Sequence, residues 1–138
     1  MAMKFSELVG GAAIFGLVGW GIENVLFGPR YSAVFGDRKI PFLPIYAAGG
    51  ATVLAVAPTL KAQGLPWPVR AAAYAGILTG IEWTGCQLDR KTLGARSWDY
   101  GDEAPAEGCI DVKHAVAWGA LGLIAESFQS GGGSARDR

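Results

Sequence analysis

Four stretches nearly free of charged residues constrain the fold of this chain most. They cover residues 5–29, 42–60, 69–88 and 115–125, and the helices that contain them are expected over residues 5–27, 42–60, 69–88 and 112–129. Each approaches the roughly 20 apolar residues that an α-helix needs to cross the hydrocarbon core of a bilayer. Charged residues make up only 17% of the chain, against about 25% in soluble domains, and most of them lie in the connections. The pattern predicts an all-α, polytopic membrane protein with four transmembrane helices.

The four helices are expected to form one domain over residues 1–130, because the chain of 138 residues is long enough for a single domain. Pro58 is expected to end the second helix, since proline disfavours helix continuation. The glycine-rich run that begins at Gly131 indicates a flexible C-terminal tail over residues 131–138. The first stretch contains Glu23 and has no clear small-x-small cleavage site, which favours a retained helix over a signal peptide.

Composition and motifs argue against several classes of function. The net charge is +0, so nothing indicates the clustered basic face that nucleic-acid binding requires. The sequence contains no G-x-x-x-x-G-K-[ST] nucleotide loop, no G-x-S-x-G elbow and no H-E-x-x-H zinc motif. His114 is the only histidine, and we expect neither a metal site nor a cofactor.

Two carboxylates lie inside the apolar stretches, where an ionised side chain costs about 2.5–3.5 kcal/mol. Glu23 and Glu82 each end a Gly-Ile-Glu triplet. The shared triplet favours two helical hairpins related as parallel repeats, with both carboxylates at similar depth; chance similarity is the alternative. Each carboxylate has either a functional role, as a cation ligand, proton relay or general acid/base, or a structural role in tying helices together.

Other polar residues are expected on the same membrane face as the two carboxylates. The candidate functional cluster consists of Glu23, Glu82, Tyr46, His114, Trp98, Asp99, Tyr100 and Arg30. The Trp-Asp-Tyr triplet forms either a segment of the interfacial aromatic belt or a plug over the site. His114 is either part of the site or an interfacial residue at a helix start. On the opposite face, Arg70 is expected to anchor at the interface and Glu126 to reach the headgroups.

Cys86 and Cys109 are the only two cysteines. They could form a disulfide if the loop that holds Cys109 faces an oxidising compartment, or remain two free thiols. The basic residues around the two long loops favour a cytoplasmic location for those loops, whereas a disulfide would favour the reverse orientation.

An ordered set of motifs resembles a known family. These motifs are Phe42-Leu43-Pro44-Ile45-Tyr46, Glu82-Trp83-Thr84-Gly85, Trp98-Asp99-Tyr100, Gly108-x-Ile110 and Trp118-Gly119. Over residues 12–123 the chain is similar to the bacterial family labelled putative ABC-transporter type IV. The family pattern has Gly where this chain has Ala47, and Asn near Ala106-Glu107. The resemblance implies a multi-pass protein of the bacterial inner membrane that serves at most as the membrane subunit of such a transporter.

Function is therefore expected to be transport-associated. The chain would be a membrane subunit or an oligomeric permease that binds a cation or proton through its membrane carboxylates, with the lipid bilayer and either further copies or a larger complex as partners. The alternatives are an integral membrane enzyme acting on a lipid headgroup or isoprenoid, and a structural assembly subunit. Whether the chain is an enzyme is left open.

Overall fold

Helices account for nearly all of the regular structure in the described residues. The computed structural model describes residues 4–27, 31–32, 40–41, 43–94, 98 and 100–131. Within them lie α1 (Phe5–Phe27), β1 (Tyr31–Ser32), β2 (Ile40–Pro41), α2 (Leu43–Ala62), α3 (Trp67–Leu93), α4 (Pro105–Gly108) and α5 (Val112–Gly131). The two-residue strands pair antiparallel, with Tyr31 opposite Pro41. The all-α prediction is confirmed.

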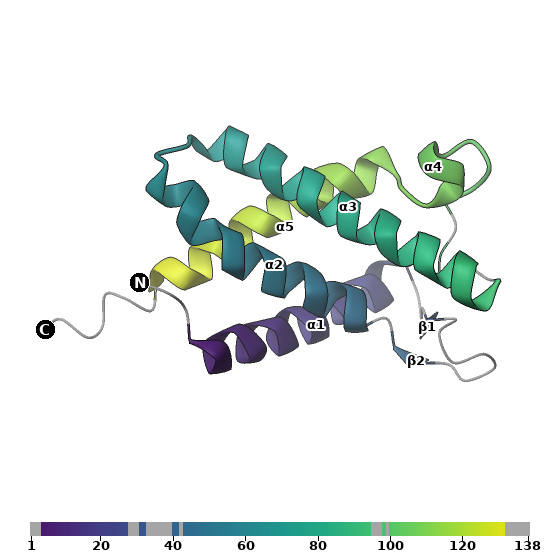
Figure 1. Cartoon of the computed structure of the whole chain (residues 1–138), viewed down its shortest axis with the longest axis horizontal. Helices are drawn as coiled ribbons and strands as arrows, with labels where there is room; N and C mark the ends of the chain where they lie inside the picture. Colours follow the sequence, from purple (N-terminus) through teal and green to yellow (C-terminus); the bar gives the residue numbers. More distant parts are fainter. Residues whose placement is uncertain are drawn as a thin grey trace, which may run out of the picture.

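The four long helices form two antiparallel pairs (Figure 1). α1 packs mainly on α2 and α3 mainly on α5, and α2 also contacts α3 and α5. The short α2–α3 turn lies at the same end of the bundle as the start of α1 and the end of α5. The β1–β2 pair and α4 lie at the opposite end, which we call the loop end. This arrangement accommodates the repeat of two parallel hairpins, which stays a prediction.

Glycines allow the helices of each pair to approach closely. A Cβ at Gly50 of α2 would lie 2.4 Å from the Phe15 Cβ of α1, and a Cβ at Gly122 of α5 would lie 2.4 Å from the Tyr74 Cβ of α3. Neither contact leaves room for a side chain. The buried core between these helices consists of Val53, Ala57, Tyr74, Leu78 and Ala125.

Two predicted helix ends are wrong. The third helix continues past residue 88 to Leu93, where Gly94 closes it in the left-handed conformation with φ 65° and donates its N–H to the Arg90 carbonyl. Residues 89–92 are polar, so charge suggested a loop, but Arg90 and Lys91 are good helix formers. Pro58 lies inside α2, which runs on to Ala62.

The helix tolerates Pro58 because α5 supplies the missing hydrogen-bond donor. Proline has no N–H to donate to the carbonyl four residues earlier, which here is the carbonyl of Leu54. The side-chain Nε2 of Gln129 donates to that oxygen at 2.8 Å. The last helix thus completes the hydrogen bonding of the second.

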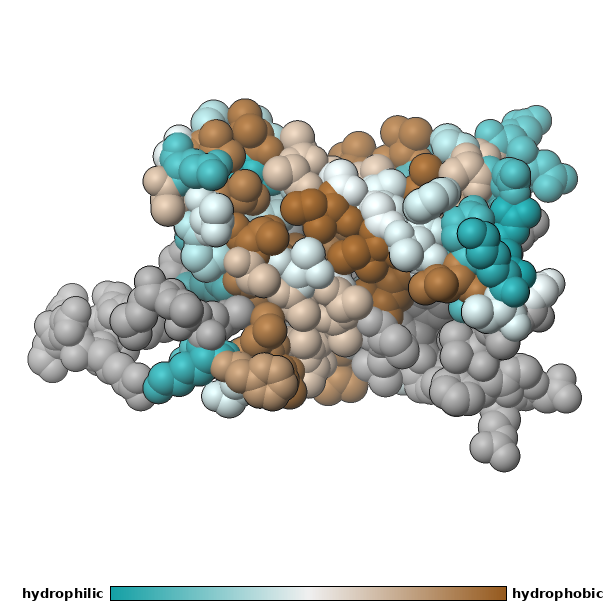
Figure 2. All heavy atoms as spheres, in the orientation of Figure 1, coloured by the Kyte–Doolittle hydropathy of each residue, from teal (hydrophilic) through white to brown (hydrophobic). Residues whose placement is uncertain are grey.

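Large apolar side chains are exposed along the long helices. They include Ile14 (61% exposed), Leu17, Trp83, Val116 and Phe128. Figure 2 shows apolar surface across the middle of the visible face and hydrophilic surface toward its ends. Within the described residues, one helix is long and apolar enough to cross a membrane, over Ile45–Ala62, and Phe5–Gly21 is a shorter apolar stretch. The prediction of four transmembrane helices is therefore not confirmed.

Candidate functional site

Glu82 lies buried in α3 and accepts hydrogen bonds from two aromatic side chains. Only 3% of its surface is exposed. The Tyr100 hydroxyl donates to Oε1 at 2.5 Å, and the Trp118 indole Nε1 donates to Oε2 at 3.2 Å. Burying a carboxylate is costly unless donors replace its water. Both oxygens of Glu82 have such donors, so the site is built around this group. We call Glu82, Tyr100, Trp118, Tyr46 and His114 the Glu82 centre.

Tyr46 and His114 add aromatic rings on either side of the two donors. The Tyr46 ring of α2 lies 5.6 Å from the Trp118 ring of α5, and the His114 ring lies 4.7 Å from the Tyr100 ring. Tyr46 fits there because Gly19 of α1 has no side chain: a Cβ would lie 2.3 Å from the tyrosine ring. Three helices and the loop before α4 therefore position the centre, and α1 leaves the space.

Asp111 fixes the start of α5 and the His114 ring. Its carboxylate accepts a hydrogen bond from His114 Nδ1 at 2.7 Å and a longer one from the His114 backbone N–H at 3.4 Å. This is the geometry of a helix N-cap. The hydrogen bond from the His114 ring holds the pKa of Asp111 below its usual 3.8. His114 is thereby oriented toward Tyr100.

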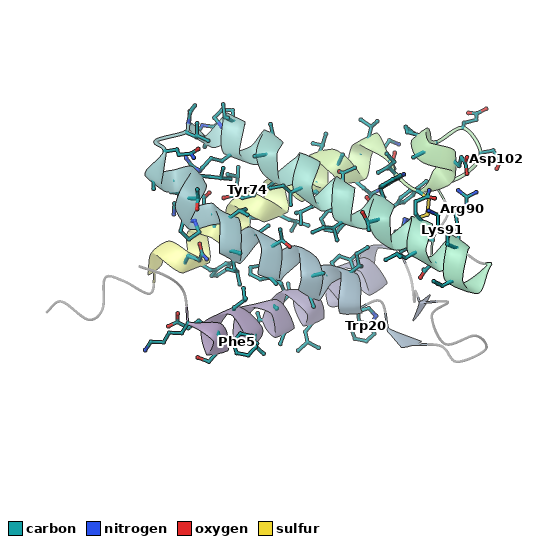
Figure 3. The ribbon with its side chains drawn as sticks, in the orientation of Figure 1. Phe5, Trp20, Tyr74, Arg90, Lys91 and Asp102 are labelled. Carbon is teal, nitrogen blue, oxygen red and sulfur yellow. A yellow bond between two sulfur atoms is a disulfide. The ribbon has the colours of Figure 1, made fainter. Side chains whose placement is uncertain are left out.

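A disulfide joins α3 to the segment that supplies Tyr100. Cys86 lies one turn after Glu82, and its sulfur is bonded to that of Cys109. The Trp98 indole donates to the Cys109 carbonyl at 3.2 Å, and Tyr100 N–H donates to the Gly108 carbonyl at 3.0 Å. Gly85 leaves room for the Trp98 ring, which would lie 3.2 Å from a Cβ at that position. Figure 3 shows the yellow sulfur–sulfur bond beside Arg90 at the loop end.

The comparison with known families covers the whole of this site. The family model described as Putative ABC-transporter type IV matches residues 12–130. The chain belongs to this family. No curated protein and no solved structure matches the chain. The matched residues, 12–130, include all five residues of the Glu82 centre.

The family member also has a second buried polar cluster, which was not predicted from the sequence. Arg70 of α3 donates from Nε to both carboxylate oxygens of Glu126, at 3.1 and 2.9 Å, and from Nη2 to Oε1 at 2.8 Å. The Tyr74 hydroxyl donates to Oε2 at 2.5 Å. We call Arg70, Tyr74 and Glu126 the Glu126 centre. It lies away from the loop end, as the position of Tyr74 in Figure 3 shows.

The prediction that Glu126 reaches the headgroups is wrong, and the interfacial position of Arg70 stays a prediction. Glu126 is 5% exposed, and the Arg70 side chain is 18% exposed and forms an ion pair with it. The sequence did contain a signal. Arg70 and Tyr74 lie one turn apart on α3, and an antiparallel α5 brings its last acidic residue, Glu126, to that level.

Five of the eight residues predicted for the candidate cluster lie at or beside the Glu82 centre. Glu82, Tyr46, His114 and Tyr100 are members, and Trp98 packs in the adjoining layer with the disulfide and Tyr100. Glu23 lies in α1, but its side chain is outside the described part of the structure, as are Arg30 and Asp99. Trp118 was not predicted as a hydrogen-bond donor to Glu82, although it lies one turn after His114 on the same helix. Among the described residues, no group of three acidic, histidine or cysteine side chains is arranged to hold a metal ion.

Proposed function

We propose that this chain is a multi-pass membrane protein associated with transport, and that the Glu82 centre binds a proton or a small cation. One observation carries the proposal: a carboxylate that is 3% exposed lies in a part of α3, residues 71–88, that has no other charged side chain, and two aromatic donors hold it. Ionisable groups in such segments commonly mark ion pathways and proton relays. The family description supports a transport role.

The surface supports placement of all four long helices in a bilayer. α1, α2, α3 and α5 contain 23, 20, 27 and 20 residues. At about 1.5 Å per residue each is about 30 Å or longer, the thickness of a hydrocarbon core. The exposed charged side chains, such as Lys4, Lys61, Lys91 and Lys113, belong to the ends of these helices, and apolar side chains are exposed between them.

The aromatic shell suits a cationic ligand. The faces of tyrosine and tryptophan rings attract cations; Trp118 donates to the Glu82 carboxylate, and the Tyr46 ring lies beside the Trp118 ring. A carboxylate also takes up a proton directly, and hydrogen bonds from a phenol and an indole can reorient around either protonation state. The printed sequence has no nucleotide-binding loop, so energy for active transport would come from an ion gradient or from another subunit.

We propose further that the transporting unit contains more than one copy or a larger subunit. The four helices pack directly on one another through glycine contacts such as Gly50 on Phe15 and Gly122 on Tyr74. Such packing leaves little internal volume for a path within one copy. Native mass spectrometry from mild detergent would show a dimer or larger assembly, and a strictly monomeric species with full transport activity would contradict this part.

The disulfide favours an orientation with the loop end on the oxidising side of the membrane, because protein disulfides persist mainly there. This reverses the orientation that the basic residues around the loops favour. The Glu82 centre would then take its ion from the outer face. In this orientation the end of α5 lies in the cytoplasm. A reporter that is active only in the cytoplasm should therefore be active when it is fused after residue 131, and an inactive fusion would contradict the orientation.

Flux through reconstituted protein tests the main proposal. Purified wild-type protein in liposomes should carry protons, Na⁺ or K⁺ down an imposed gradient, read with a pH-sensitive dye and ion-selective dyes. Glu82→Gln keeps the shape but removes the titrating group, and we expect at least a tenfold loss of flux. Glu103→Gln, an exposed acid at the same end of the molecule, is the matched control and should retain wild-type flux. No flux by the wild type, or equal flux by Glu82→Gln, would contradict the proposal.

A further inference from the structure

The segment between Tyr100 and Cys109 is attached to α3 at both ends. We call residues 100–109 the strap. At one end the Tyr100 hydroxyl donates to Glu82 Oε1 at 2.5 Å. At the other end Cys109 is bonded to Cys86, one turn further along the same helix. Tyr100, at the first end of the strap, therefore lies against Glu82, and the other end is fixed one turn further along α3, at the loop end of the bundle.

We propose that the Cys86–Cys109 disulfide is a latch that holds the strap closed over Glu82, so that opening the latch gives water at the loop end access to the carboxyl group. The inference rests on the proposed role of Glu82 as an ion-binding group. It adds a controlling element, because access of ions to Glu82 then depends on a covalent bond elsewhere in the site.

The contacts around Cys109 show why this bond controls Tyr100. The backbone N–H of Tyr100 donates to the carbonyl of Gly108, the neighbour of Cys109, at 3.0 Å. The Trp98 indole donates to the Cys109 carbonyl itself. Both ends of the strap thus meet beside the disulfide, and release of Cys109 removes the anchor of the segment that presents Tyr100 to Glu82.

The backbone of the strap is held in an unfavourable conformation. Ala106 and Glu107 have φ of 53° and 57°, in the left-handed region that residues with a side chain seldom adopt. The buried disulfide and an ion pair between Arg90 of α3 and Glu107 hold this part of the strap against α3. This ion pair is exposed to solvent and therefore weak. Without the disulfide it would not hold the strap by itself, so the strap would relax away from α3.

The latch is protected while it is closed. Cys86 and Cys109 have 0% exposure, and Trp98, at 8%, packs on them. Gln87 Nε2 also lies 3.6 Å from the Cys109 sulfur. A reductant reaches the sulfurs only when the strap opens transiently, which suits a latch that stays closed in an oxidising compartment. Its reduction by a water-soluble phosphine converts the disulfide and one water to two thiols and the phosphine oxide.

Chemical labelling of Glu82 tests the latch, and Glu126 serves as the internal control in the same molecule. A water-soluble carbodiimide activates an accessible carboxyl group, and glycine ethyl ester then displaces the urea to form an amide that mass spectrometry detects. Both carboxylates are buried, at 3% and 5% exposure, but Glu126 accepts its described hydrogen bonds from Arg70 and Tyr74, away from the strap. In full-length Cys86→Ala/Cys109→Ala protein we expect Glu82 to label at least fivefold faster than in the wild type, with Glu126 unchanged.

Two further samples keep the test independent of how well the double variant folds. Wild-type protein reduced with the phosphine should show the same rise at Glu82, and reoxidation should reverse it. Tyr100→Phe keeps the latch but removes one donor, and we expect less than a twofold rise. Unchanged labelling of Glu82 in the reduced and double-variant proteins, or an equal rise at Glu82 and Glu126, would overturn the latch.

The labelling and flux experiments test the latch and the ion-binding role of Glu82 separately. If Glu82→Gln leaves flux intact while reduction exposes Glu82 to the carbodiimide, the latch stands and the proposed ion-binding role does not. If Glu82→Gln abolishes flux while reduction leaves the labelling unchanged, the proposed function stands and the latch is overturned.

Discussion

Glu82 and Glu126, two of the buried carboxylates in the described residues, are held by different kinds of donor. Glu126 is held by the guanidinium of Arg70, which neutralises its charge, and by Tyr74. Glu82 accepts hydrogen bonds from two neutral aromatic donors, the phenol of Tyr100 and the indole of Trp118. The Glu126 centre joins two helices, α3 and α5. The Glu82 centre also includes a ring from α2 and a loop tied by a disulfide, so it can respond to movement of that loop.

Removing the cation of the Glu126 centre is expected to destabilise the protein most. Arg70→Ala leaves Glu126 buried without its ion-pair partner, a change that costs about 3–5 kcal/mol. We expect this loss in the free energy of unfolding measured by denaturant titration in detergent. Lys91→Ala removes an exposed cation from the same helix and should cost less than about 0.5 kcal/mol. Equal effects of the two substitutions would show that the buried pair is not a structural element.

A methyl group added at Gly122 tests how tightly the Glu126 centre is packed. Because a Cβ there would lie 2.4 Å from Cβ of Tyr74, Gly122→Ala must separate α3 from α5, and we expect a loss of about 1–3 kcal/mol. Gly76→Ala is the control, since its Cβ would meet nothing within 4 Å; it should be neutral or stabilise the helix by up to about 1 kcal/mol. Thermal unfolding of both variants measures the difference, and a Gly122→Ala protein as stable as Gly76→Ala would refute the close contact.

A double-mutant cycle tests the donor that Gln129 supplies. Gln129→Leu leaves the Leu54 carbonyl without that bond, and we expect a loss of about 1–3 kcal/mol. Pro58→Ala restores a helical N–H four residues after Leu54, so in that background the same Gln129→Leu substitution should cost less than about 0.5 kcal/mol. Denaturant titrations of the four proteins give the coupling free energy. Equal costs in both backgrounds would contradict the proposed pairing.

The smallest expected effect is the pH dependence from Asp111 beside the Glu82 centre. Its pKa is lower in the folded protein than its usual 3.8, so the folded state favours the ionised form. That contribution to stability is complete above the unfolded pKa and is lost as pH falls through the lower folded value. Asp111→Asn is also a good N-cap but does not titrate. We expect the melting temperature of the wild type to fall more than that of Asp111→Asn between about pH 5 and pH 3, and parallel curves would exclude the linkage.

The sequence predicted the helices better than it predicted their ends. Charge-free stretches located all four long helices, because apolar content reports the packed or lipid-facing layer of a helix. That signal stops at residue 88, whereas the hydrogen bonding of α3 continues to Leu93. Proline likewise signals a lost donor, and no local pattern reveals that Gln129, 75 residues later, replaces it.

The sequence indicated part of the Glu82 centre for a similar reason. An acid in an apolar run stands out, and the antiparallel helix order brings Tyr46, His114 and Tyr100 to the same end of the bundle. Trp118 and the Glu126 centre were missed because tryptophan at a helix face is usually part of the core and because a terminal acid usually reaches water. Their roles depend on which faces of α3 and α5 meet, and these faces include the close contacts of Gly119 with Ala71 and of Gly122 with Tyr74.

The hydrogen bond between Gln129 and the Leu54 carbonyl forms only after α5 has been synthesised. When a ribosome has produced the first three helices, Leu54 still lacks its donor and Arg70 still lacks Glu126. Both needs are met together when α5 is inserted. A chain truncated before Glu126 would therefore display one open carbonyl and one unpaired arginine, two features that membrane quality-control proteases could use to distinguish unfinished copies from complete ones.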